Sequence, residues 1–316
     1  MPGEPWALGL IRRLPGSHIL SAMRRLALAL MLAGPTPGLA QTFDVSAAKA
    51  IPQAPASVDL SAQFIDAPRK QGHLSSCHTF VAVALIEAAY FRQHGVHARL
   101  SEADLFVRRN AAPALPFLRS REGGMVRPDL RYALAHGVMP GDFYEVFEAR
   151  YHAFKKRFFK FLDKRNSVVA ELLPESATPE ANAAREKIRE EIRGFSAEGE
   201  PFLKFIGAAA RSVVKKDAVK CDEARVAGFL ERQLNAGRPV GVGLNSGWTK
   251  TPAWRRDANG DGGSHYFVVS GYDRAAAGAV FHTRNSWSEG GSPDLSGPDL
   301  CEVFAVTWVR APADTD

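Results

Sequence analysis

A cysteine lies where a polar, glycine-containing loop runs into a long apolar segment. The loop begins at Gln71, the cysteine is Cys77, and the apolar segment Phe80–Tyr90 has the composition of a buried helix. A thiol at a helix N-terminus faces unpaired backbone N–H groups and the positive end of the helix dipole, and both favour the nucleophilic thiolate. Gln71 is near enough in sequence to offer its side-chain amide to the same spot. These residue types predict a nucleophile with an oxyanion donor.

A cysteine nucleophile needs a base and a neutral group that orients the base. His265 begins the apolar, strand-like segment Tyr266–Tyr272, and Asn285 follows a second strand-like segment. The ends of two adjacent strands can deliver a histidine and an asparagine to one place. The chain therefore has the side chains for acyl transfer to a thiol, provided that its elements bring Cys77, His265 and Asn285 together.

The elements that must position these residues change in type along the chain. After the helix that Cys77 opens, which we expect to end near Gly95, the pattern predicts short helices at 100–107 and 127–136. The block 148–216 has a helical pattern throughout, with pieces at 151–162, 180–193 and 202–214. A further helix at 222–236 precedes strands at 239–244, 266–272, 279–283 and 302–309, which predict a mostly antiparallel sheet.

Taken together and in order, these motifs resemble the papain-like cysteine peptidases. The order of the motifs is that of the family: Gln71 and Cys77 precede an apolar helix, His265 begins a strand, and Asn285 lies in Asn-Ser-Trp. Further short matches are Pro55–Asp59, Leu100–Leu105, Glu122–Gly124 and Gly237–Val240. The separations from Cys77 to His265 and Asn285 exceed the ~130–150 residues typical of the family by about the length of the 148–216 block.

The resemblance implies an α+β fold of two lobes with a cleft between them. One lobe would be helical, at 55–147, and the other would be built on an antiparallel, β-barrel-like sheet, at 217–316. The block 148–216 would be a helical insertion that serves as a lid, as a docking surface for a partner or as helices packed on the main body.

The resemblance also implies roles for single residues. Cys77 would be the nucleophile, His265 the acid and base, and Asn285 the residue that orients it. Gln71 and the Cys77 backbone N–H would form the oxyanion hole. The substrate site would include Gly123 and Gly124, which would pair with the substrate backbone, Trp287, which would shield the Asn285–His265 bond, and Ser264, which stands where the family often has an acidic residue. A peptide or protein would be hydrolysed through a thioester, without a cofactor.

The chain departs from the family beside the nucleophile. The family usually has Cys-Gly-Ser-Cys-Trp there, whereas this chain has Leu74 in place of the first cysteine and His78 in place of the tryptophan. The departures leave the pH dependence and the specificity open. Two alternatives also remain, namely a catalytically silent binding or scaffold protein of the same fold, and a thiol transpeptidase or cell-wall peptide hydrolase.

Residues 1–40 have the pattern of a secretory signal peptide, with a basic Met23–Arg25, an apolar Leu26–Ala33 and small residues before Gln41. Met23 is an alternative start, and 41–54 form a short lead. The apolar run is far below the ~20 residues that span a bilayer. We therefore expect a periplasmic or secreted protein with no stable membrane insertion after signal cleavage. In an oxidising compartment Cys221 and Cys301 are available to form a disulfide while Cys77 stays free; whether they pair is open.

The sequence gives little support for a nucleic-acid partner or a bound metal. The net charge is +6, but the basic residues are spread along the chain and form no nucleic-acid motif. Asp257, Asn259 and Asp261 match the first half of a calcium loop. The twelfth position, which should be Glu, is Val268, and a strand follows in place of a helix. A polar turn that leads to His265 is the simpler interpretation, and a calcium site is the alternative.

Overall fold

The computed structural model describes residues 55–65, 67–72, 74–111, 124–158, 165–201, 223–245, 264–275, 278–286, 292 and 294–314. The chain divides into two units, Met1–Gln53 and Ala54–Asp316, and all described residues belong to the second. The predicted signal peptide (1–40) and lead (41–54) lie outside the described residues, so both stay predictions.

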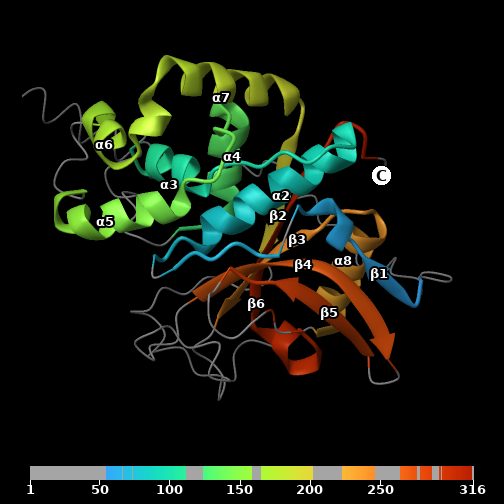
Figure 1. The fold of residues 1–316 in the computed structure, drawn as a ribbon. Coiled ribbons are helices and arrows are strands. Elements are labelled where there is room, and N and C mark those ends of the chain that lie inside the picture. The colour runs from blue at the N-terminus through green and yellow to red at the C-terminus, as the bar shows by residue number, and fades with distance from the viewer. Residues whose placement is uncertain are drawn as a thin grey trace, which may run out of the picture. The chain divides into compact units, whose positions relative to one another are not determined.

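One sheet of six strands, all paired antiparallel, runs through the second unit (Figure 1). The strands are β1 (Ser57–Asp59), β2 (Ser196–Pro201), β3 (Val240–Asn245), β4 (Ser264–Ala275), β5 (Gly278–Arg284) and β6 (Val303–Arg310). Their order is β1-β4-β3-β6-β2, and β5 pairs with β4 as well. The four strands predicted beyond residue 238 are confirmed, with ends that differ by a few residues.

The sheet is open, so the expectation of a barrel-like sheet is wrong. β3 pairs with the first half of β4 and β1 with its second half, while β5 runs along β4 with a register shift between Val269 and Gly271. Closure needs the two outermost strands to pair with each other. In the described part of the chain, β2 pairs with β6 and β5 pairs with β4, and no ladder joins β2 to β5. The division into two lobes stays a prediction.

Helices cover both faces of this sheet. Side chains alternate between the two faces along a strand, and in β4 Tyr266 and Val268 pack in the core cluster that contains the apolar side of α2 (Cys77–His94). Phe267 and Val269 pack in a second cluster with α8 (Glu223–Asn235). β4 is therefore buried on both sides, as its nearly continuous apolar sequence requires.

The remaining α-helices lie on the α2 side of the sheet, where α4 also contacts β2 (Figure 1). They are α3 (Glu102–Ala111), α4 (Val126–His136), α5 (Tyr144–Phe158), α6 (Arg165–Leu172) and α7 (Pro179–Glu191), and the short 3-10 helices are η2 (Ser61–Gln63), η5 (Pro174–Ala177) and η9 (Gly297–Glu302). α2 ends as predicted at Gly95, whose φ of 70° is the left-handed conformation that glycine adopts without strain. Ser101 caps the start of α3, because the Asp104 backbone N–H donates to Ser101 Oγ.

The block 148–216 is helical only in part. α5 and α7 overlap the pieces predicted at 151–162 and 180–193, whereas α6 lies between the predicted pieces. Tyr151 and Leu172 share a core cluster with Phe80 and Phe106 of α2 and α3. The helices are thus packed on the main body. Residues 196–201 form β2, which pairs with β6 over its whole length, so the helical prediction is wrong there. The helical piece predicted at 202–214 lies outside the described residues.

Candidate functional site

Cys77 is the first residue of α2, as the sequence predicts. The turn before it is held from the side by Tyr144 of α5. The Tyr144 hydroxyl donates to the Gln71 backbone oxygen at 2.9 Å and therefore accepts from Ser76 Oγ at 2.6 Å. The start of α2 is thereby fixed to α5, and the Cys77 side chain is buried, with 8% of its surface exposed.

The surroundings of the Cys77 sulfur do not favour the thiolate. Burial raises the pKa of the Cys77 thiol to about 11, and the negative charge of Asp129 acts in the same direction. The backbone N–H groups of Tyr266 and His78 donate to the sulfur and lower the pKa, but they do not offset burial. The expectation that the helix N-terminus favours the thiolate is therefore wrong for this structure, because desolvation outweighs the N–H groups.

His265 and Asn285 meet where β4 begins and β5 has just ended. The pairing of Val268 with Arg284 aligns these ends, and His265 Nε2 lies 2.8 Å from Asn285 Oδ1. Because an amide oxygen only accepts, Nε2 carries the ring proton and Nδ1 is the basic nitrogen. Burial lowers the pKa of His265 to about 4, against the effect of the Asn285 hydrogen bond, which raises it.

The backbone of Tyr266 links the two halves of the candidate site. Its N–H donates to the Cys77 sulfur, and Tyr266 directly follows His265 in β4. The sulfur therefore lies beside the peptide unit next to His265. The start of α2, with Cys77, thus lies beside the start of β4, where His265 contacts Asn285.

Gln71 joins this group through Ser286, the neighbour of Asn285. Ser286 Oγ donates to Gln71 Oε1 at 2.6 Å, and the Gln71 backbone N–H donates to the Ser286 oxygen at 2.8 Å. Gln71 Nε2 donates to the Leu74 backbone oxygen at 2.8 Å. One of the two amide protons is thus used inside the loop, and the second is the one that an oxyanion could accept.

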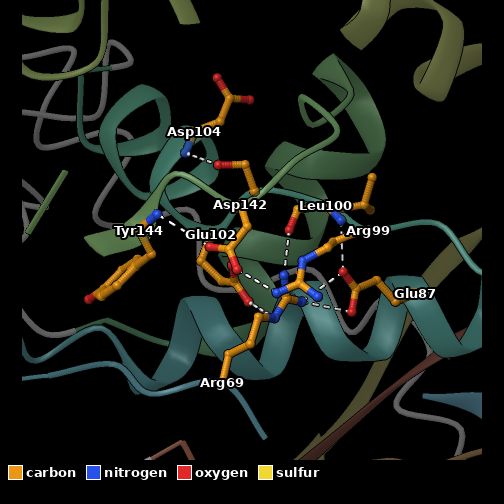
Figure 2. Close-up of polar contacts among 9 residues, drawn as sticks. Arg69, Glu87, Arg99, Leu100, Glu102, Asp104, Asp142 and Tyr144 are labelled. Atoms are coloured by element: carbon orange, nitrogen blue, oxygen red, sulfur yellow. Dashed lines mark hydrogen bonds and ion pairs between the residues drawn. The ribbon is translucent and has the colours of Figure 1, made fainter. Parts of the chain in front are cut away.

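Arg69, two residues before Gln71, makes the contacts drawn in Figure 2. The Arg69 guanidinium donates to Glu87 of α2 at 2.7 Å and to the Leu100 backbone oxygen at 2.9 Å, and it pairs with Glu102 of α3 at 2.8 Å. Glu87 also accepts from the Leu100 backbone N–H. One cation therefore joins the loop, α2, the segment before α3, and α3.

Burial has the largest effect on the pKa of the two carboxyl groups in this cluster. It raises the pKa of Glu87 and raises that of Glu102 to about 8, although the Arg69 charge opposes both shifts. Sequence reasoning missed the cluster formed by Arg69, Glu87 and Glu102. One signal was present, because Glu87 interrupts the apolar run of a helix that is buried from Phe80 to Tyr90 except at Ala84. A buried charge in such a run requires a partner.

A cavity of about 50 Å³ opens beside the cluster. Its walls include Phe64, Phe80, Val268, Arg284 and Ser286, in addition to the three cluster residues. Neither Cys77 nor His265 lines it, so this cavity is distinct from the place where those two residues meet.

A buried contact between a histidine and an aspartate lies next to Cys77. His78 Nδ1 is 2.6 Å from Asp129 Oδ2 of α4, and both side chains are almost fully buried. Sequence reasoning noted His78 in place of the family's tryptophan and did not single out Asp129. In the structure, His78 joins α2 to α4 through a buried side-chain contact.

The structure describes only some of the other predicted site residues. Gly124 is described and lies over His78. Six of them lie outside the described residues, namely Gly123, Trp287, Cys221, Asp257, Asn259 and Asp261. The side chain of Ser264 also lies outside the described part. Cys301 is disulfide-bonded and Cys77 is a free thiol. The pairing of Cys301 with Cys221 stays a prediction, as do the roles of the other residues.

The described part of the chain has neither a metal-binding group of side chains nor a helix that could cross a bilayer. No group of three or more His, Cys, Asp or Glu side chains there is arranged to hold a metal ion. No helix in the same part of the chain combines the length and the hydropathy needed to cross a bilayer.

Comparison with known proteins gives a weak structural likeness. No protein-family model matches the sequence, and no curated protein matches it. The structure is similar to that of a digestive procathepsin L 3 from the larval midgut of Tenebrio molitor, with 16% sequence identity, a TM-score of 0.46, and coverage of 82% of this chain and 71% of that chain. A likeness at this level assigns neither family nor activity, so a functional assignment has to rest on the contacts described above.

Proposed function

We propose that this protein is a cysteine-type peptidase that hydrolyses peptide bonds through Cys77, His265 and Asn285. The observation that carries the proposal is the arrangement at the start of β4. There His265 is held by Asn285 at 2.8 Å, and the N–H of the next residue donates to the Cys77 sulfur. A nucleophile, a base and a neutral group that orients the base are the parts that thiol acyl transfer requires.

The proposed reaction begins with the peptide carbonyl beside Cys77. His265 Nδ1 takes the thiol proton as the sulfur attacks the carbonyl carbon. The oxyanion that forms accepts from the Cys77 backbone N–H and from the second amide proton of Gln71. His265 then gives its proton to the leaving amine, the C–N bond breaks, and a thioester remains. Water attacks the thioester with His265 as base, which releases the carboxylic acid and restores the thiol.

The ionisation of the resting site suits general-base catalysis. With the pKa of the Cys77 thiol near 11 and that of His265 near 4, both groups are neutral at ordinary pH. A neutral imidazole can accept a proton, and a neutral thiol has one to give. In this proposal the proton moves during attack, and no thiolate–imidazolium pair forms beforehand.

A catalytically silent binding protein is the second candidate. Two observations favour it, namely the high pKa of the Cys77 thiol and the use of one Gln71 amide proton by Leu74. A silent protein would keep the fold and the His265–Asn285 contact, and it would bind a peptide without cleaving it. Export of the protein, with a peptide or protein substrate outside the cytoplasm, also stays a proposal, since it rests on residues 1–40.

Cleavage of a fluorogenic peptide library by the full chain tests the proposal. We expect turnover by the wild type, none by Cys77→Ala, and a loss of ~10²–10⁴-fold in His265→Ala, the range typical of general acid–base catalysis. Glu186→Gln, on the exposed side of α7 and away from the reacting groups, is the control. Peptide binding without cleavage by the wild type would favour the silent binding protein. Transfer of the acyl group to an added amine instead of water would indicate a transpeptidase.

A further inference from the structure

His78 is fixed by contacts that leave its ring no alternative position. Its side chain is 1% exposed, and Nδ1 lies 2.6 Å from Asp129 Oδ2. Thr79 Oγ1 donates to the same carboxylate oxygen at 2.8 Å, and Arg109 pairs with the other at 3.0 Å. Because a carboxylate oxygen only accepts, His78 Nδ1 carries a proton. The ring is thereby bonded to the first turn of α4, which contains Asp129.

The face of this ring supports the backbone just before α4. A Cβ atom built on Gly124 would lie 2.6 Å from His78 Cε1, 2.8 Å from Nε2 and 2.9 Å from Nδ1. Three distances so nearly equal place that position over the face of the imidazole, since a position at its edge would be much nearer one atom. His78 Nε2 is buried and has no hydrogen-bond partner among the described residues. The ring therefore meets Gly124 by stacking alone.

These two contacts form a connected path. The carboxylate of Asp129 holds the imidazole of His78, and the imidazole sets how deeply the Gly124 backbone can lie. Asp129 and Gly124 belong to one short stretch of chain, so the ring fixes that stretch against the start of α2. The residue that does this is the direct neighbour of Cys77.

We propose that His78, held by Asp129, is a positioning residue that fixes the Gly124 backbone as the edge on which a bound peptide pairs, and so governs peptide affinity. The proposal rests on the proposed function and on the expectation, stated from the sequence, that Gly124 pairs with the substrate backbone. The His78 ring is covered by Gly124 and engaged by Asp129, and it takes no part in proton transfer. Changes at His78 therefore alter the binding of the peptide more than the attack on it.

A double-mutant cycle between positions 78 and 124 tests this inference. We expect Gly124→Ala to raise KM at least tenfold in the wild-type background, because the added methyl meets the ring, while kcat changes less than threefold. In the His78→Ala background the same change should raise KM less than threefold, since the ring is gone. Gly228→Ala in α8, where the nearest atom to a new Cβ is 3.7 Å away, is the matched control and should show no coupling to position 78.

The same cycle is repeated as a binding measurement in the Cys77→Ala background, with a fluorescent peptide and its Kd as the readout. Lack of cleavage by the wild type would overturn the proposed function, while coupling in Kd would still support the role of His78. Additive effects of the two changes, or a loss confined to kcat, would overturn the inference. His78→Gln provides the test if His78→Ala does not fold; it should raise KM while the thermal midpoint stays close to that of the wild type.

Discussion

At the scale of single residues, burial opposes ionisation on both sides of the proposed proton transfer. It raises the pKa of the Cys77 thiol to about 11 and lowers that of the His265 imidazole to about 4. Hydrogen bonds to each group act against these shifts and are outweighed. The reactivity of Cys77 in the absence of a peptide therefore reports directly how far water is excluded from the thiol.

Alkylation of Cys77 by iodoacetamide should accordingly rise about tenfold per pH unit from pH 6 to about 10, because only the thiolate reacts. The raised pKa leaves the thiol protonated over that whole range. Asp129→Asn should increase the rate at a given pH, since removal of the negative charge lowers the pKa of the thiol. Mass spectrometry of the labelled Cys77 peptide gives the rate, with Cys77→Ala as the blank. A rate that is already constant between pH 5 and 7 would contradict the neutral resting pair.

At the scale of elements, the site depends on how three chain segments are held together. The β4–β5 register sets Asn285 beside His265, Tyr144 fixes the turn before α2, and Arg69 fixes the base of the Gln71 loop. Arg69 differs from the other two contacts because it pairs with two buried carboxyl groups. Its removal would leave these buried groups without their cationic partner, which costs far more than the loss of an exposed ion pair.

Arg69→Met should therefore destabilise the protein by ~3–5 kcal/mol in urea unfolding at pH 7. Arg99→Met is the matched control. Arg99 pairs with Asp142 in the same region, but both side chains are more than a third exposed, so its loss should cost at most ~1 kcal/mol. Equal losses in the two variants would show that the Arg69 cluster is not the stronger link.

At the scale of the whole molecule, Glu102 makes stability depend on pH. Burial raises its pKa from the ordinary value of 4.5 to about 8, so between these values the folded protein holds a proton that the unfolded chain releases. Stability therefore falls as pH rises through this window. The burial of Glu87, whose pKa is also raised, acts in the same direction.

The free energy of unfolding should thus decrease from pH 5 to pH 8, with a contribution from Glu102 of at most about 5 kcal/mol. Glu102→Gln, which mimics the protonated side chain, should flatten this part of the profile and should be more stable than the wild type at pH 8. Urea unfolding at several pH values measures the effect. Glu186→Gln, on the exposed side of α7, is the control and should follow the wild-type profile.

The parts of the structure that follow local sequence rules could be predicted, and those that depend on distant partners could not. α2 has a continuous apolar run and a glycine stop, and β4 is apolar throughout, so both are visible in the sequence. His265 and Asn285 lie at strand ends, which made their meeting predictable. β2 has the sequence Ser-Ala-Glu-Gly-Glu-Pro, which lacks the residue types typical of strands, and its conformation comes from pairing with β6.

The residues of the site also divide into those that local sequence rules predict and those that depend on distant partners. The positions of Cys77 and Gln71 follow from the loop-to-helix pattern, whereas the ionisation of Cys77 follows from burial that only the packed structure reveals. Arg69 and Glu102, like His78 and Asp129, are far apart in sequence and meet only through the packing of α2 on α3 and α4. No local rule connects such pairs.

The edge strand β2 has a practical consequence for work on the helical block. β6 pairs with β3 on one side and with β2 on the other. A deletion of 148–216 would remove β2 together with the helices and leave a row of backbone N–H and C=O groups of β6 without partners. Such an exposed edge recruits strands from other copies and leads to aggregation. Insolubility of that deletion would therefore reflect a bare sheet edge, and a variant that retains Ser196–Pro201 is needed to learn what α5, α6 and α7 contribute.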